Sequence, residues 1–198
     1  FPGGSPLPTR AVYRDTPFGQ ALNGAVRRAA GGLVAGRDPT LPLRVLEVGG
    51  GSGSTTEAVL QGLEGRAVEY VFTDLSPTLV DAARDQVQHP SLSFRVLDIE
   101  RSPEEQEFDP GDYDMVVAAN VLHATRDLHD TLSHVRSLLR PGGVLLLLEG
   151  THSEPWVDIT FGLTDGWSRG RDRWRDGRSP LLSVEAWRSA LGSAGFDG

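Results

Sequence analysis

The 198-residue sequence contains no cysteine and no lysine. The absence of cysteine excludes disulfide bonds and thiolate metal sites, and it argues against a secreted protein. The absence of lysine excludes catalysis through a lysine Schiff base. No apolar run approaches the roughly 20 residues of a membrane helix, and the opening FPGGSPLPTR lacks the apolar core of a signal peptide. We therefore expect a cytoplasmic protein without a membrane partner.

Acidic residues outnumber basic ones, and the net charge is −8 at pH 7. A general binder of nucleic-acid phosphates needs a basic surface, so we expect no nucleic-acid partner. The length suits a single α/β core. Residues 1–40, rich in Gly, Pro and Arg, are expected to form a lead-in or small lid with a helix over 19–33, and residues 41–198 the core. Because the chain opens on Phe1 and stops in mid-pattern, we expect a segment of a longer protein.

Apolar and amphipathic stretches alternate after residue 42. Strands are expected at 44–48, 69–73, 93–96, 115–119 and 144–149, and helices near 55–62, 77–87 and 130–139. Such alternation predicts βαβ units and a mostly parallel sheet. The segment RPGG, residues 140–143, is expected to end the last helix and turn the chain into the fifth strand. In this fold class, ligands bind outside the carboxyl ends of the strands.

The stretch LRVLEVGGGSGSTTEAVL, residues 43–60, is typical of a strand, a tight turn and a helix. It resembles a nucleotide-binding turn, but Ser54 or Thr56 stands where the dinucleotide fingerprint needs its third glycine. A P-loop is excluded because no Gly-Lys-Ser/Thr sequence follows the turn. The sequence of the turn therefore favours a ligand without a bound pyrophosphate.

Glu47 indicates the charge of that ligand. A carboxylate at the end of the strand repels a pyrophosphate and attracts a cation. S-adenosylmethionine (SAM) carries a sulfonium and an ammonium and no phosphate. The spacing of Glu47, Gly49, Gly51 and Gly53 resembles motif I of class I SAM-dependent methyltransferases. The alternative is an ordinary glycine-rich turn.

Two more acids follow expected strands. Asp74 lies about 20 residues beyond the glycines, the offset at which an acid binds ribose hydroxyls. Leu75, the next residue, is included among the expected cofactor contacts. Asp98 is expected to accept a hydrogen bond from the adenine amine, with Ile99 covering the ring. Helix caps or turn residues are the alternative interpretation of both acids.

His123 follows the fourth expected strand, and Glu149 ends the fifth. If these strands are neighbours, both side chains reach one crevice. A histidine is a natural general base near neutral pH, and a carboxylate on its other nitrogen fixes the tautomer. For His123 the alternative is a polar residue that starts a helix. The remaining histidines show no metal-ligand spacing, so we expect no metal and a surface position for each: His89, His129, His134 and His152.

Taken together, the motifs resemble the methyltransferase domains embedded in polyketide synthases and in hybrid peptide–polyketide synthases. The matching segments are FPGGS, LEVGGGSGSTT, YVFTDLS, LDIE, AANVLHAT, LLRPGGVLLLLE, FGLTDGW and RSPLLSVEAW. The resemblance implies a class I SAM-dependent, Rossmann-like fold. It also implies methylation of the α-carbon of a β-ketoacyl thioester on an acyl carrier protein, with neighbouring synthase domains as partners.

The resemblance also assigns individual residues. It implies that His123 and Glu149 deprotonate the α-carbon, that Tyr13 and Asn120 lie near cofactor and substrate, and that Trp167 lines the acyl pocket. Two departures from the family pattern concern the acceptor. Ser168-Arg169-Gly170 stands where a second aromatic residue is common, and the segment before motif I is short.

Several alternatives remain open at this point. Methylation of a β-hydroxyl or enol oxygen is one, since shorter family members do this. An inactive structural domain and a nicotinamide oxidoreductase are others, disfavoured by the intact acids and histidine and by the failed dinucleotide fingerprint. The final antiparallel hairpin of the class I fold has no counterpart in the sequence, so an open sheet edge is expected.

Five arginines gather in the segment WSRGRDRWRDGR, residues 167–178. In an acidic chain this density suggests a docking surface for an acidic carrier protein or for the pantetheine phosphate. A solvated loop with interleaved aspartates is an equally good interpretation. The arginines are Arg169, Arg171, Arg173, Arg175 and Arg178.

Overall fold

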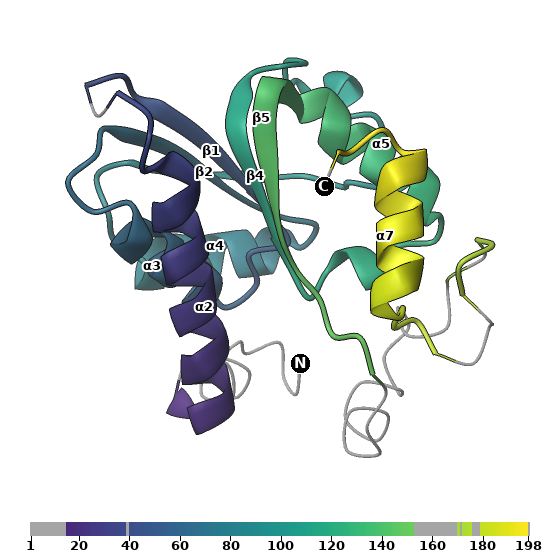
Figure 1. Ribbon diagram of the computed structural model, residues 1–198. Coiled ribbons are helices and arrows are strands. Elements are labelled where there is room, and N and C mark those ends of the chain that lie inside the picture. The colour runs from purple at the N-terminus through teal and green to yellow at the C-terminus, as the bar shows by residue number, and fades with distance from the viewer. Residues whose placement is uncertain (1–14, 39, 153–169, 171, 176–178, 198) are drawn as a thin grey trace.

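A computed structural model of the chain describes residues 15–38, 40–152, 170, 172–175 and 179–197 (Figure 1). Five strands form one sheet in the order β3-β2-β1-β4-β5, and all four neighbouring pairs are parallel. The predicted α/β fold and the predicted adjacency of the fourth and fifth strands are confirmed. The strands are β1 (Leu43–Val48), β2 (Val68–Asp74), β3 (Leu92–Val96), β4 (Tyr113–Ala119) and β5 (Leu139–Leu148).

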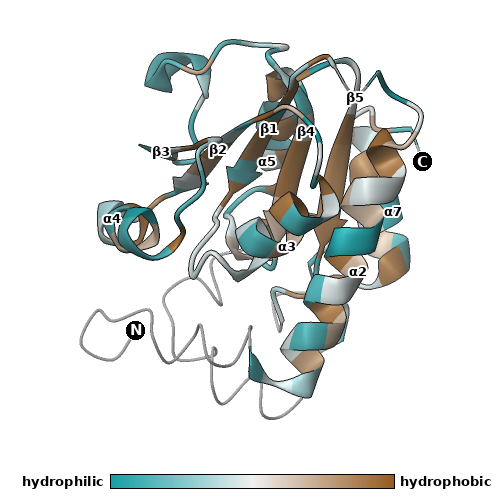
Figure 2. Cartoon of the chain, turned by 90° about the vertical axis from the view of Figure 1, so that its left-hand side faces the viewer, coloured by the Kyte–Doolittle hydropathy of each residue, from teal (hydrophilic) through white to brown (hydrophobic). Residues whose placement is uncertain are grey.

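Helices cover both faces of the sheet (Figure 1). One face carries α2 (Pro17–Val34), α3 (Ser54–Gly62) and α4 (Pro77–Gln86), and the other carries α5 (Leu128–Leu138) and α7 (Val184–Ser193). Because successive strand residues face opposite sides, Val45 packs with α2 and α3, whereas Leu46 packs with α5. The strands β4 and β5 are accordingly mostly apolar along their length, and Figure 2 shows them in brown.

The helix expected over 19–33 is confirmed as α2. Pro17 occupies its first turn, and the Thr16 hydroxyl accepts a hydrogen bond from the N–H of Gly19 at 3.1 Å. Val26, Ala30 and Val34 of α2 join the core shared with α3. The helix is therefore packed onto the sheet, and the prediction that it acts as a lid remains a prediction.

The turn from α5 into β5 differs from the prediction. The helix ends at Leu138 and the strand begins at once, so that Pro141 and Gly142 lie inside β5 instead of before it. Gly142 adopts a φ of 73°, and the pairing register shifts between Tyr113 and Met115. Proline has no N–H for the ladder, which explains why the irregularity lies here.

Three further elements were not predicted from the sequence. The helix α7 follows Ser183, whose hydroxyl accepts a hydrogen bond from the N–H of Ala186 at 3.2 Å. Two short 3-10 helices, η2 (Glu104–Gln106) and η3 (Leu122–Ala124), follow β3 and β4. Of these, η3 carries His123.

The sheet has two edges within the described residues, β3 on one side and β5 on the other. The antiparallel hairpin that ends the class I fold has no strand in this part of the chain. None of the described helices is long and apolar enough to cross a lipid bilayer.

Candidate active site

The glycine turn joins β1 to α3 at the centre of the sheet. Gly49, Gly51 and Gly53 have φ values of 64°, 53° and 76°, a region that side-chain-bearing residues rarely adopt. A Cβ on Gly49 would lie 2.4 Å from Val121 Cγ2, whereas a Cβ on Gly51 would approach only one atom of the described residues, the Gly49 carbonyl oxygen at 3.9 Å. A Cβ on Gly53 would lie 2.5 Å from Val87 Cγ2, so the turn is packed at both ends and open beside Gly51.

Asp74 is the last residue of β2 and lies beside this turn. Its Oδ2 accepts a hydrogen bond from the N–H of Gly51 at 3.0 Å, and its Oδ1 accepts one from the N–H of Ser76 at 2.9 Å. Burial raises the pKa of Asp74 above its ordinary value, against the opposing hydrogen bonds from Ser76 and Gly51. The carboxylate therefore links the second strand to the turn. Its contact with ribose stays a prediction.

Glu47 points into the protein beneath the turn and is 1% exposed. Its Oε2 accepts hydrogen bonds from the Thr56 hydroxyl at 2.5 Å and the Tyr70 hydroxyl at 2.9 Å. Burial raises the pKa of Glu47 to about 7, the two hydroxyls lower it, and Asp74 raises it further. Glu47 thus joins β1, β2 and α3 in the structure, and its attraction for a cofactor cation stays a prediction.

The loop after β3 is held by Gln106. The Gln106 side chain accepts from the N–H of Asp98 and donates to the Asp98 carbonyl, both at 2.9 Å. Ile99 is buried, and its carbonyl lies 2.8 Å from Nδ1 of His134. His134 is therefore half-buried, contrary to the surface position expected for it. Leu75 is 62% exposed and leaves an apolar surface beside Asp74.

His123 and Glu149 come together at the carboxyl ends of β4 and β5. His123 Nδ1 lies 2.5 Å from Glu149 Oε2, and the side chains are 11% and 2% exposed, respectively. Glu149 Oε1 accepts from the N–H groups of Val121 and Leu122, at 3.1 and 2.8 Å. The predicted contact is present, and the carboxylate fixes both the ring and the start of η3.

Asn120 joins the ends of these two strands. It has a φ of 52°, a conformation that asparagine tolerates better than most residues. Its N–H donates to the Leu148 carbonyl at 2.7 Å, and its Oδ1 accepts from the N–H of Gly150 at 3.2 Å. Asn120 therefore holds the backbone on both sides of Glu149, a role that the sequence did not suggest.

One member of the arginine cluster is not a surface residue. The Arg175 side chain is 2% exposed and forms an ion pair with Asp172, which is 3% exposed. Arg173 is exposed, and its guanidinium lies 4.6 Å from the centre of the Trp174 ring. The structure removes Arg175 from any docking surface. Tyr13, Trp167 and the other three arginines lie outside the described residues.

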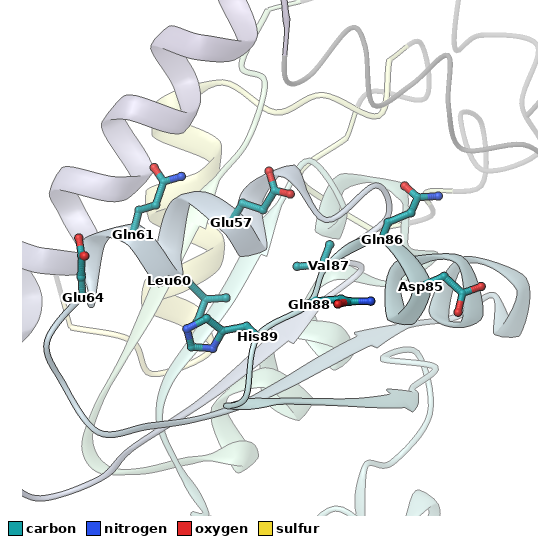
Figure 3. Close-up of a pocket in the computed structure, with 9 residues that line it drawn as sticks. All are labelled: Glu57, Leu60, Gln61, Glu64, Asp85, Gln86, Val87, Gln88 and His89. Atoms are coloured by element: carbon teal, nitrogen blue, oxygen red, sulfur yellow. The ribbon is translucent and has the colours of Figure 1, made fainter.

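A surface hollow of about 590 Å³ lies between α3 and the segment after α4 (Figure 3). None of the predicted site residues lines it, so it is distinct from the site described above. No cluster of three potential metal ligands occurs within the described ranges. The hollow is lined by Glu57, Leu60, Gln61, Glu64, Asp85, Gln86, Val87, Gln88 and His89.

Comparison with known proteins places this site in a family. Residues 46–145 match a family described as "Methyltransferase domain". The chain is 49% identical over 164 residues to the non-reducing polyketide synthase dpmpA of Macrophomina phaseolina, which covers 78% of this chain and 7% of that protein. It is 39% identical over 207 residues to the polyketide synthase ThaQ of Burkholderia thailandensis, covering 99% of this chain and 10% of ThaQ.

A solved structure gives a similar result. The CurJ carbon methyltransferase is 38% identical, with a TM-score of 0.94 over 100% of this chain and 53% of the CurJ chain. The chain therefore spans a small part of the two synthases and about half of the CurJ structure. Since the family match covers half of the sequence, the chain belongs to the methyltransferase domain family, and it is a class I, SAM-dependent methyltransferase domain of the polyketide synthase type.

Proposed function

We propose that this domain methylates the α-carbon of a β-ketoacyl thioester carried on an acyl carrier protein. The observation that supports this most is the buried contact between His123 and Glu149, at 2.5 Å. Because Nδ1 of His123 is hydrogen-bonded to Glu149, Nε2 is the imidazole nitrogen that would accept the proton. The α-proton of a β-ketoacyl thioester is acidic enough for such a base.

The residues around the glycine turn fit SAM. The open space beside Gly51 admits a ligand close to the backbone, and the nearby carboxyl groups of Glu47 and Asp74 favour a cation over a pyrophosphate. We infer that Asp74 binds the ribose, that Asp98, Ile99 and Leu75 surround the adenine, and that Asn120 lies close to the cofactor. When bound, SAM supplies an electrophilic methyl group and takes up the electron pair of its sulfur–methyl bond.

His123 performs the proton transfer in this proposal. Its Nε2 takes the α-proton, and the electrons of the broken C–H bond form an enolate. The α-carbon then forms the new C–C bond with the methyl group. The proton remains on the imidazolium, whose charge the buried Glu149 carboxylate stabilises, until it passes to solvent.

The carrier protein and the neighbouring synthase domains are part of the same proposal. The two synthases that match the chain are far longer than it. Within the described residues of the arginine cluster, Arg173 is exposed and charged, so it is suited to contact an acidic carrier surface. Tyr13 and Trp167 are proposed to contact the acceptor.

The deciding experiment supplies SAM with a deuterated methyl group together with a β-ketoacyl and a β-hydroxyacyl carrier substrate. Tandem mass spectrometry then locates the label. We expect label on the α-carbon of the ketoacyl chain. Label on the β-oxygen would replace this proposal with oxygen methylation, and absence of label from both substrates, with SAM binding retained, would support an inactive structural domain.

A further inference from the structure

Arg175 uses most of its donors on the backbone around His123. Its Nη1 donates to the carbonyl oxygens of His123 at 2.8 Å and of Thr125 at 2.7 Å. Its Nη2 donates to the Arg126 carbonyl at 3.3 Å. Three carbonyls of the turn that follows the histidine are therefore gathered by one planar guanidinium.

Asp172 fixes this guanidinium in place. Its Oδ2 accepts from Nε of Arg175 at 2.9 Å and from the N–H of Leu128, the first residue of α5, at 3.1 Å. Burial alone would raise the pKa of Asp172, but its hydrogen bonds and the charge of Arg175 outweigh this and hold it below the ordinary value. The ion pair is thus anchored at the N-terminus of α5, where a carboxylate is favourable.

Neighbouring residues leave the pair little freedom. The Trp174 ring stacks on His129 of α5, with ring centres 6.4 Å apart and planes at 2°. A Cβ on Gly170 would lie 2.5 Å from Cζ and two nitrogens of the Arg175 guanidinium. A glycine at this position lets the chain pass directly over the arginine.

The contacts of Arg175 complement those of Glu149. Glu149 binds the N–H groups just before His123 and the imidazole itself, whereas Arg175 binds carbonyls at and after His123. Between them lies η3, one short 3-10 turn, a geometry with weak hydrogen bonds of its own. External partners on both sides therefore determine the direction of the imidazole.

We propose that Arg175, held by Asp172, is a positioning residue for His123. A buried ion pair is an inefficient way to stabilise a fold, because desolvation offsets its attraction. What arginine provides is a rigid, planar set of donors with fixed directions. The kinetic part of this inference rests on the proposed function, since it takes His123 as the base.

The test compares Arg175→Gln and Arg175→Lys with Arg188→Gln, an exposed arginine of α7 that undergoes the same charge change. For Arg175→Gln we expect kcat to fall by about 10- to 100-fold, the range for a misplaced catalytic group, with SAM affinity and KM within about twofold. Lysine should recover part of the loss. Arg188→Gln should retain full activity.

The same substitutions in a His123→Ala background separate positioning from general structural support. If Arg175 acts through His123, adding Arg175→Gln to His123→Ala lowers the residual rate by less than about twofold. A full, multiplicative loss in that background would overturn the proposal.

A second readout does not depend on the acceptor. In protein labelled with ¹⁵N-histidine, the His123 ring nitrogens report its tautomer and its hydrogen bond to Glu149. Arg175→Gln should shift these resonances and Arg188→Gln should not. Unchanged His123 resonances in folded Arg175→Gln would refute positioning even if wild-type protein methylated neither substrate. Should Arg175→Gln fail to fold, Gly170→Ala, which presses on the guanidinium and keeps its charge, should give the same shift in milder form.

Discussion

Glu47→Gln tests the electrostatics beneath the glycine turn. Burial raises the pKa of Glu47 from 4.5 to about 7, so the folded protein keeps a proton that the unfolded chain releases between these values. At about 1.36 kcal/mol per pKa unit, wild-type stability should fall by about 3 kcal/mol as pH rises through this window. Below the lower value both states are protonated, and above the upper value both are ionised, so the stabilisation is complete only in acid.

Glutamine preserves the shape of the site. Both hydroxyl donors bind the same oxygen of Glu47, and the amide oxygen of glutamine can accept both. The assay is urea unfolding of both proteins at closely spaced pH values from about 4.5 to 8.5. Subtracting the two free energies of unfolding removes the contribution of other titrating groups. The wild-type value should drop relative to Glu47→Gln by about 3 kcal/mol, mostly between pH 5 and 7.

Glu64→Gln is the matched control, since Glu64 is an exposed residue just after α3. The stability of wild type relative to Glu64→Gln should not fall between pH 5 and 7. A pH-independent difference between wild type and Glu47→Gln would refute the reasoning, because Glu47 would then titrate as it does in the unfolded chain. If SAM brings positive charge close to Glu47, saturating SAM should lower the pKa of this carboxyl. The drop in relative stability should then become smaller and end at a lower pH.

Three other predictions concern the site and its surface. His123→Ala should reduce turnover by roughly 10²–10⁴-fold with SAM affinity by calorimetry nearly unchanged; equal loss of SAM binding would make His123 structural. Gly51→Ala should lower the free energy of unfolding in urea by about 1–2 kcal/mol, because alanine rarely adopts the φ of 53° found at Gly51. As a control, Gly32→Ala within α2 should raise the free energy of unfolding by about 0.5–1 kcal/mol. Arg173→Glu should weaken binding of a carrier protein at low salt; unchanged affinity would exclude Arg173 from docking.

The sheet and the contact between His123 and Glu149 were predictable because they follow from position along the chain. Alternating apolar and amphipathic segments indicate parallel strands, and parallel strands bring their carboxyl ends to one edge. Two polar residues that follow neighbouring strands are therefore close in space, however far apart they are in sequence. This reasoning needs no knowledge of packing.

The orientation of Glu47 and the burial of Arg175 did not follow from such rules. Charge alone was used to place Glu47, and its attraction for a cofactor cation stays a prediction. Its hydrogen bonds to Thr56 and Tyr70 depend on strand parity, which it shares with Val45 on the face of α2 and α3. Arg175 stands in a run of charged residues typical of a surface loop. Its burial depends on carbonyls some 50 residues away, which no local pattern reveals. The helix α7 was signalled by Ser183 and by the spacing of Trp187 and Ala190, but the signal is short.

The strand order also separates two tasks along the chain. The inferred contacts to ribose and adenine follow β2 and β3, whereas all residues of the proposed base and its surroundings come after β4. These are Asn120, His123, Glu149 and Arg175. The exposed residues 109–111 lie between these halves. Exchange of everything beyond them between related domains would replace His123, Glu149 and Arg175 together and leave the inferred ribose and adenine contacts in place.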